Sequence, residues 1–218
     1  MKRIFLTLLL LLFCTTPVVP AAFSAEKVIY SFEEDFDGWA IPDWSRDKVD
    51  YVTEKVDISK SKASDGKSSL EMKVDFPKEG WYAGVVDVEG PFDWSKYKAI
   101  SCDIHAPSRA MERIEARISL NVGKKWIWIE QIKPTKLERA KWTTVRADLE
   151  VGSRSWRRTE MVEKKDKEGK FRGYVARYIP VELSEEDKKN VQVLTVRVEA
   201  INSPYKGPIY IDNIRLEE

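Results

Sequence analysis

The sequence is poor in the residues that build metal centres and disulfide frameworks. It has one His and two Cys among 218 residues. A single His excludes a centre with several His ligands from one chain, and two Cys exclude a Cys-rich zinc site or a dense set of disulfides. Neither sign of charge is in excess, since 37 Lys and Arg face 36 Asp and Glu. This balance argues against a protein that mainly neutralises nucleic-acid phosphates.

Long apolar runs are also missing, except near the N-terminus. The apolar run Ile4–Phe13 follows two basic residues and is too short to span a bilayer. Small residues at the expected positions predict cleavage after Ser24. We therefore expect residues 1–24 to be a signal peptide and residues 25–218 to form a single secreted or periplasmic domain, with no membrane span.

Export changes the interpretation of the two cysteines. Cys14 lies in the predicted signal, and lipidation there is a lesser alternative because a bulky aromatic residue precedes it. Cys102 is then alone, and it shares its strand phase with Ile100 and Ile104, so we expect it to be buried. His105 is three residues further on, where an extended chain turns it to the opposite face. This spacing disfavours Cys–His catalysis.

Short segments of alternating polarity, separated by turn residues, predict about ten β-strands and almost no helix. The expected strands are Val28–Glu33, Tyr51–Ile58, Ser69–Phe76, Trp81–Val88, Lys98–His105, Ile114–Val122, Lys125–Ile132, Trp142–Leu149, Val191–Ala200 and Pro208–Leu216. Such a series predicts an all-β fold, an antiparallel β-sandwich. Residues 150–180 are rich in charge and predict a long loop or hairpin excursion. One short helical turn is expected near 184–189, with Ser184 as its N-cap.

The eight Trp exceed what a core of this size needs, and two of them have a strand phase that favours a working surface. In the strand expected over 125–132, Ile127 and Ile129 fill the core. Trp126, Trp128 and Glu130 then share the other face. Two exposed Trp at positions i and i+2 form a flat platform on which sugar rings stack. The alternative is that both Trp pack under the 150–180 excursion.

Polar residues from neighbouring strands are expected beside this platform. The turn at Gly123 predicts a hairpin that places Arg117 and Asn121 next to the two Trp. Neighbouring strands would add His105 and Arg197. The predicted ligand-binding residues are therefore Trp126, Trp128, Arg117, Asn121, Glu130, His105 and Arg197.

The other Trp divide between core and loops. We expect Trp39, Trp94 and Trp142 to be core or sheet-edge residues, while Trp44 and Trp156 lie in loops and stay undecided. Trp81 and Tyr82 start a strand and point to opposite faces, so we expect one of the two to be accessible. The basic residues around Trp156 predict a lip over the ligand and hint at an acidic glycan.

Three motifs in order resemble a known family. They are Tyr30-Ser31-Phe32-Glu33 followed by Asp37-Gly38-Trp39, then Asp65-Gly66-Lys67-Ser68-Ser69-Leu70-Glu71-Met72, and finally Gly207-Pro208-Ile209-Tyr210-Ile211-Asp212-Asn213-Ile214. This series resembles the galactose-binding-like jelly rolls, which include carbohydrate-binding modules of secreted glycan-degrading systems. The resemblance implies a jelly roll that binds a polysaccharide or oligosaccharide.

The same resemblance implies a structural Ca²⁺, held at the positions that match Glu33, Asp65 and Asp212. Calcium prefers carboxylate and carbonyl oxygens, and an unpaired carboxylate in the apolar strand around Asp212 would be costly. A Lys or Arg partner for Asp212, or its exposure, are the alternatives.

The sequence thus favours a non-catalytic carbohydrate-binding protein. Glu130 has no acid two residues away on its strand, so it lacks the partner of a glycosidase pair. One alternative is an envelope structural module that binds another protein. The other is a small polysaccharide lyase, for which His105 is the one imidazole.

Overall fold

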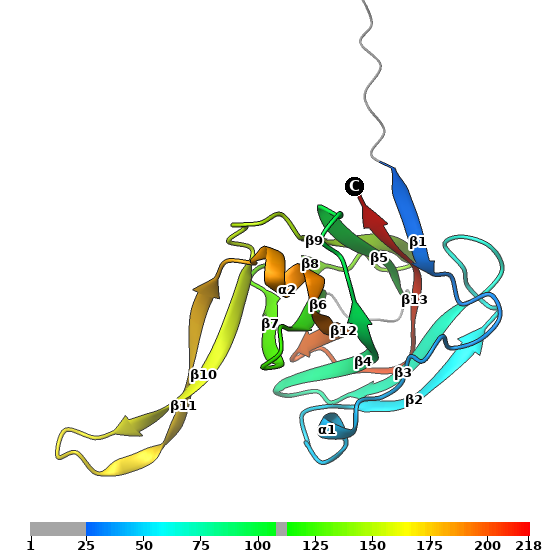
Figure 1. The fold of residues 1–218 in the computed structure, drawn as a ribbon. Coiled ribbons are helices and arrows are strands. Elements are labelled where there is room, and N and C mark those ends of the chain that lie inside the picture. Colours follow the sequence, from blue (N-terminus) through cyan, green and yellow to red (C-terminus); the bar gives the residue numbers. More distant parts are fainter. Residues whose placement is uncertain (1–24, 108–112) are drawn as a thin grey trace, which may run out of the picture.

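Two antiparallel β-sheets stack face to face, as the sequence predicts (Figure 1). The computed structural model describes residues 25–107 and 113–218. The predicted signal peptide, including Cys14, lies outside the described residues. Within these ranges, no helix has the length and apolar character needed to cross a membrane.

The first sheet has six strands and joins the two ends of the described chain. Its order is β2-β3-β13-β5-β9, and β1 pairs with β13. The strands are β1 (Glu26–Tyr30), β2 (Thr53–Ser59), β3 (Ser69–Phe76), β5 (Ala99–Ala106), β9 (Lys141–Asp148) and β13 (Tyr205–Glu217).

The second sheet has seven strands and carries the site described below. Its order is β11-β10-β7-β6-β12-β4, and β8 pairs with β6. The strands are β4 (Trp81–Phe92), β6 (Ile114–Val122), β7 (Ile127–Gln131), β8 (Thr135–Lys136), β10 (Trp156–Lys165), β11 (Phe171–Val181) and β12 (Val191–Ile201).

The core lies between the sheets and follows the period-two alternation. On β6, Ile118 and Leu120 are buried in it, while Arg117 and Ser119 point to the other face of the seven-stranded sheet. Cys102 of β5 is fully buried, and burial raises the pKa of its thiol. This confirms the prediction that Cys102 is a core residue.

The excursion over 150–180 is mostly a β-hairpin, formed by β10 and β11. Only two residues of β10 pair with β7, so most of the hairpin extends away from the sandwich (Figure 1). The helical turn is α2 (Glu185–Lys189), capped by the Ser184 side chain as predicted. A second short helix, α1 (Asp43–Arg46), was not expected from the sequence.

Candidate functional site

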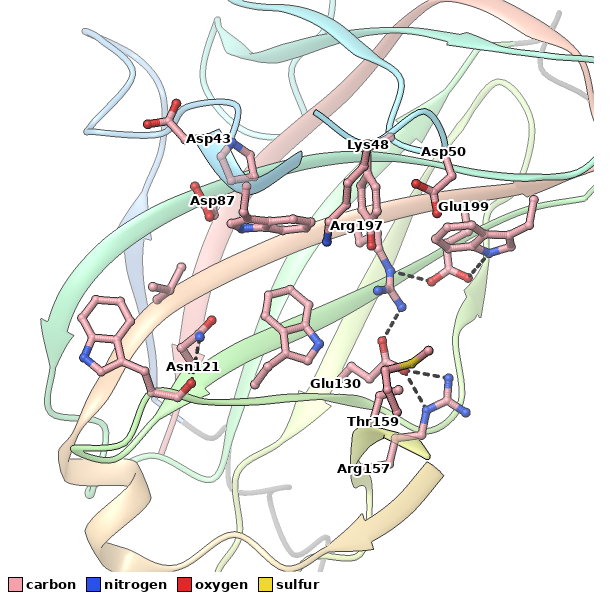
Figure 2. Close-up of a pocket in the computed structure, with 18 of the residues that line it drawn as sticks. Asp43, Lys48, Asp50, Asp87, Asn121, Glu130, Arg157, Thr159, Arg197 and Glu199 are labelled. Carbon is pink, nitrogen blue, oxygen red and sulfur yellow. Dashed lines mark hydrogen bonds and ion pairs between the residues drawn. The ribbon is translucent and has the colours of Figure 1, made fainter. Parts of the chain in front are cut away.

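A groove of about 950 Å³ lies on the face of the seven-stranded sheet that points away from the core (Figure 2). The strands supply its floor. The α1 segment lines one side, and the base of the β10–β11 hairpin lines the other. The lining residues are Pro42, Asp43, Trp44, Lys48, Asp50, Tyr51, Trp81, Asp87, Glu89, Asn121, Trp126, Trp128, Glu130, Arg157, Thr159, Met161, Tyr178, Val193, Arg197 and Glu199.

A continuous row of aromatic rings crosses the groove. Trp128 of β7 meets Trp44 of α1 edge to face, with ring centroids 5.7 Å apart. Trp44 then contacts Tyr51 at 5.0 Å, and Tyr51 contacts Trp81 of β4 at 5.9 Å. The Lys48 ammonium lies 4.7 Å from the Trp44 ring centroid. These contacts fix the ring orientations before any ligand arrives.

Trp126 lies at one end of the groove in a strained turn. Its φ is 54°, in the left-handed region that a bulky residue rarely adopts, and its side chain is 50% exposed. The Asn121 side-chain amide donates to the Trp126 carbonyl at 3.2 Å and so stabilises this turn. Because the turn includes Trp126, β7 begins at Ile127 and not at residue 125 as predicted.

The floor contains a buried chain of ion pairs. Glu130 accepts from Arg157 at 2.8 Å and also from Arg197. Arg197 donates to Glu199 at 2.8 Å, and the Arg117 guanidinium lies 2.6 Å from the same carboxylate. Figure 2 shows the part of this chain that faces the groove. Every member therefore holds its neighbours in one orientation.

The charges of this chain are stabilised by their partners. Burial alone lowers the pKa of Arg197, but the carboxylates of Glu199 and Glu130 outweigh burial and raise it above its ordinary value. Burial alone raises the pKa of Glu199, but Arg197 and Arg117 outweigh burial and lower it. Both groups are thus charged at neutral pH. Trp81 adds a hydrogen bond from its indole N–H to Glu199, at 3.2 Å.

A more acidic region adjoins Trp44. Burial, with a smaller contribution from the charge of Glu89, raises the pKa of Asp87 to about 6. The Trp44 indole donates to Asp87 and opposes this rise. Asp87 therefore keeps its proton to a higher pH than an ordinary Asp carboxyl group does.

The structure brings five of the seven predicted binding residues together. Trp126, Trp128, Asn121, Glu130 and Arg197 all line the groove. The predicted hairpin is present and Asn121 lies opposite Trp128, but the turn spans residues 123–126, so the register is shifted by two residues from the one that a two-residue turn at Gly123 predicts.

Two predicted binding residues lie elsewhere. Arg117 is 6% exposed and pairs with Glu199, and it is not among the residues that line the groove. His105 belongs to β5 of the other sheet, where it is 4% exposed and packs against Trp142 and Tyr210. Strand alternation gives the phase of His105 but not its sheet, which explains why the sequence placed it wrongly. Ile127, expected in the core, is 38% exposed.

The remaining Trp are resolved by the structure. Trp39 and Trp94 are core residues as expected. Trp142 is not in the core, because it shares a face with the exposed Arg146 and contacts His105 edge to face. Trp156, expected in a loop, is fully buried and donates to the Asp148 carbonyl at 2.7 Å.

The groove also contains residues that the sequence did not assign to it. Tyr51, Asp87 and Glu89 belong to segments that meet β7 only in the folded chain. Of the predicted lip, Arg157 reaches the groove, whereas Arg154 pairs with the exposed Glu182 outside it.

Two of the three residues predicted to hold calcium, Glu33 and Asp212, accept hydrogen bonds from backbone amides. Glu33 accepts from the amides of Lys67 and Ser68, at 2.8 and 2.9 Å. Asp212 is buried and accepts from the amides of the adjoining loop residues Ser64 and Asp65. In residues 25–107 and 113–218, no group of three or more His, Cys, Asp or Glu is placed to hold a metal. This arrangement does not fit a calcium cage, and calcium binding stays a prediction of the sequence.

Comparison with solved structures identifies the same sandwich in carbohydrate-binding modules. The CBM27-1 module of Caldicellulosiruptor saccharolyticus, solved with mannohexaose, superposes with a TM-score of 0.55 at 22% identity, over 88% of this chain and 96% of that one. The family 11 module of the cellulosomal cellulase Lic26A-Cel5E of Clostridium thermocellum superposes with a TM-score of 0.52 at 19% identity, over 89% and 95%. At these identities the likeness concerns the fold.

Sequence comparison defines the family. No curated protein sequence matches the chain significantly. The family model for the carbohydrate binding domain, family 11, matches residues 15–198. This match spans most of the sequence, and the fold of the similar structures agrees with it. The chain therefore belongs to family 11 of the carbohydrate-binding domains.

Proposed function

We propose that the protein is a secreted or periplasmic, non-catalytic module that binds a polysaccharide or oligosaccharide in the groove of the seven-stranded sheet. The observation that carries this proposal is the row of rings from Trp128 through Trp44 and Tyr51 to Trp81, set beside a buried chain of ion pairs. Aromatic faces stack on the C–H faces of sugar rings, while the Arg and Glu side chains interact with hydroxyls.

Trp126 supports a role in binding. A left-handed φ at a bulky residue costs about 1–2 kcal/mol, and a half-exposed ring returns little of this through packing. Strain without a packing gain is typical of functional positions. The turn that Asn121 stabilises holds this ring at the groove end, where a further sugar would stack on it.

The charges favour an uncharged glycan over the acidic one suggested by the basic residues around Trp156. Arg157 and Arg197 both pair with Glu130, and Arg197 also pairs with Glu199. The groove also contains Asp87 and Glu89, whose carboxylates repel an acidic sugar. The CBM27-1 module was solved with mannohexaose, and another structure of a family 11 module from Clostridium thermocellum was solved with a β-1,3-1,4-mixed-linked tetrasaccharide. Both sugars are uncharged.

The ion pairs also support a non-catalytic role. A glycosidase needs one protonated carboxyl group and one free carboxylate near the scissile bond. Glu199 is held charged by Arg197 and Arg117, which makes it a poor acid. Asp87 has a raised pKa, and Glu89 lies two residues away on the same strand. These two carboxyl groups are therefore the pair to test. Release of reducing ends from mixed-linkage β-glucan, lost in Asp87→Asn, would overturn the non-catalytic proposal.

A glycan microarray combined with affinity electrophoresis tests the binding proposal. We expect retention on uncharged β-linked glucans or mannans and none on uronic-acid polymers. Absence of binding to any glycan on the array would overturn it. Fractionation of the native host, with antibody detection outside the cytoplasm, tests the proposed export.

A further inference from the structure

The β10–β11 hairpin continues one wall of the groove away from the sandwich (Figure 1). We propose that an exposed strip along this wall binds the same glycan beyond the groove. The strip is formed by Met161 and the rings of Tyr178, Tyr174 and Phe171. The protein then selects long chains over short oligosaccharides. This inference rests on the proposed function and adds the length of the ligand to it.

The strip is continuous with the groove at the base of the hairpin. Met161 and Tyr178 already line the groove. Thr159, another lining residue, is paired with Tyr178, so these side chains lie on one face of the hairpin. The Arg157 guanidinium lies 4.0 Å from the centre of the Tyr178 ring and fixes that ring against the groove.

Further along the hairpin, the same face carries two more rings. Glu163 pairs with Tyr174, and Lys165 pairs with Phe171. The Tyr174 and Phe171 rings contact each other at 5.3 Å. The exposed fractions are 60% for Tyr174, 50% for Phe171 and 63% for Met161. From Tyr178 to Phe171 the strip spans about 20 Å, at about 3.3 Å per residue.

A β-bulge keeps Phe171 on this face. The three steps from Phe171 to Tyr174 oppose only two steps on β10, and an odd number of steps would otherwise turn Phe171 to the opposite face. Gly173 lies in the bulge with a φ of 110°, which a side chain disfavours. A Cβ at Gly173 would meet no atom within 4 Å, so backbone conformation and not space explains the glycine.

The opposite face of the hairpin differs in chemistry. Glu160 pairs there with Arg158 at 2.8 Å and with Arg177 at 2.7 Å, and Val175 lies beside them. Exposed apolar strips on a soluble protein commonly mark a binding surface. Continuity with the groove identifies the occupant of this strip as the chain that occupies the groove.

A paired calorimetric titration tests the strip. The variant is Phe171→Ala/Tyr174→Ala, and its matched control is Val175→Ala/Arg177→Ala on the opposite face of the same strand. The probes are a mixed-linked β-1,3-1,4 tetrasaccharide and the parent glucan, with mannohexaose and mannan in parallel. We expect the double variant to lose about tenfold in affinity for the polymers. Its affinity for the tetrasaccharide, and both affinities of the control, stay unchanged.

Several results would overturn the inference. One is full polymer affinity in the double variant, and another is an equal loss for the tetrasaccharide. A third is a wild-type protein that sediments as a dimer and a double variant that sediments as a monomer, with equal affinity for the glycan. That result would assign the strip to a protein–protein contact through the edge strand β11. The proposed function fails separately, when the wild-type protein binds no glycan at all.

Discussion

Trp44 and Trp128 meet edge to face, with ring centroids 5.7 Å apart and an interplanar angle of 77°. One comes from the α1 segment and the other from β7, so their contact attaches the N-terminal part of the domain to the groove floor. Edge-to-face pairs contribute about 0.5–1.5 kcal/mol beyond the area they bury.

This contact predicts energetic coupling between the two residues. In a double-mutant cycle with Trp44→Ala and Trp128→Ala, we expect a coupling of about 1 kcal/mol in the free energy of unfolding. Urea unfolding followed by circular dichroism measures it. The control cycle combines Trp44→Ala with Trp142→Ala, on the other sheet, and additive effects are expected there. Additivity in the first cycle would show that the rings do not stabilise each other.

The buried ion pairs predict a large cost for losing Glu130. Glu130→Gln leaves Arg157 and Arg197 without their shared carboxylate, and breaking a buried pair costs about 3 kcal/mol or more. Glu182→Gln is the control, because its partner Arg154 is exposed and such surface pairs contribute less than about 1 kcal/mol. Urea midpoints compare the two variants. Equal losses would mean that the floor does not depend on this carboxylate.

Asp87 predicts a pH-dependent stability. Its pKa rises from 3.8 to about 6 on folding, so the folded protein binds the proton more tightly than the unfolded chain does. Below about pH 4 Asp87 is protonated in both states and does not lower the stability. As the pH rises through about 6 the carboxyl group of the folded protein loses its proton, and above this pH the full cost of its buried charge is present.

The variant Asp87→Asn removes this charge and keeps an acceptor for Trp44. We expect it to exceed the wild type in unfolding free energy by about 1–2 kcal/mol at about pH 8, after allowance for solvent screening. The gain should vanish at about pH 4. Thermal unfolding of both proteins across this range measures it. A gain that is the same at every pH would point to a cause other than titration.

The predicted calcium ion has a direct test. Glu33 and Asp212 stabilise the loop after residue 63 through amide hydrogen bonds. If these bonds alone stabilise the loop, the melting temperature is the same in CaCl₂ and in EDTA. A higher melting temperature in CaCl₂ than in EDTA, with no such difference in Asp212→Asn, would instead support the calcium prediction.

The fold was largely predictable because several strands, β6 among them, alternate in polarity. Ser69–Phe76 and Ile114–Val122 have the predicted bounds, and the turn residues Pro77 and Gly123 follow their last residues. The same alternation placed Trp128 and Glu130 on the face opposite Ile129, and the hairpin turn placed Asn121 beside them. Strand alternation and turn residues are local properties of the chain, so they can be recognised in the sequence alone.

The rest of the groove depends on contacts between distant segments. Nothing local to Trp44, Tyr51 or Asp87 indicates that they face β7. His105 shows the converse limit, because its phase was correct while its sheet was not. Trp142 was within reach of the sequence, since it shares its phase with Thr144 and Arg146 and not with Val145. The charged neighbours of Trp156 suggested a loop, yet Trp156 begins β10 and is buried in the core.

Calorimetric titration of Trp128→Ala with mannohexaose and with the mixed-linked tetrasaccharide tests the central claim most directly. Trp142→Ala, which removes a Trp from the other sheet, is the matched control. We expect the affinity of Trp128→Ala to fall at least about tenfold for the glycan that the wild type binds, while Trp142→Ala binds as the wild type does. Wild-type affinity in a folded Trp128→Ala protein would contradict the assignment of the groove as the glycan site.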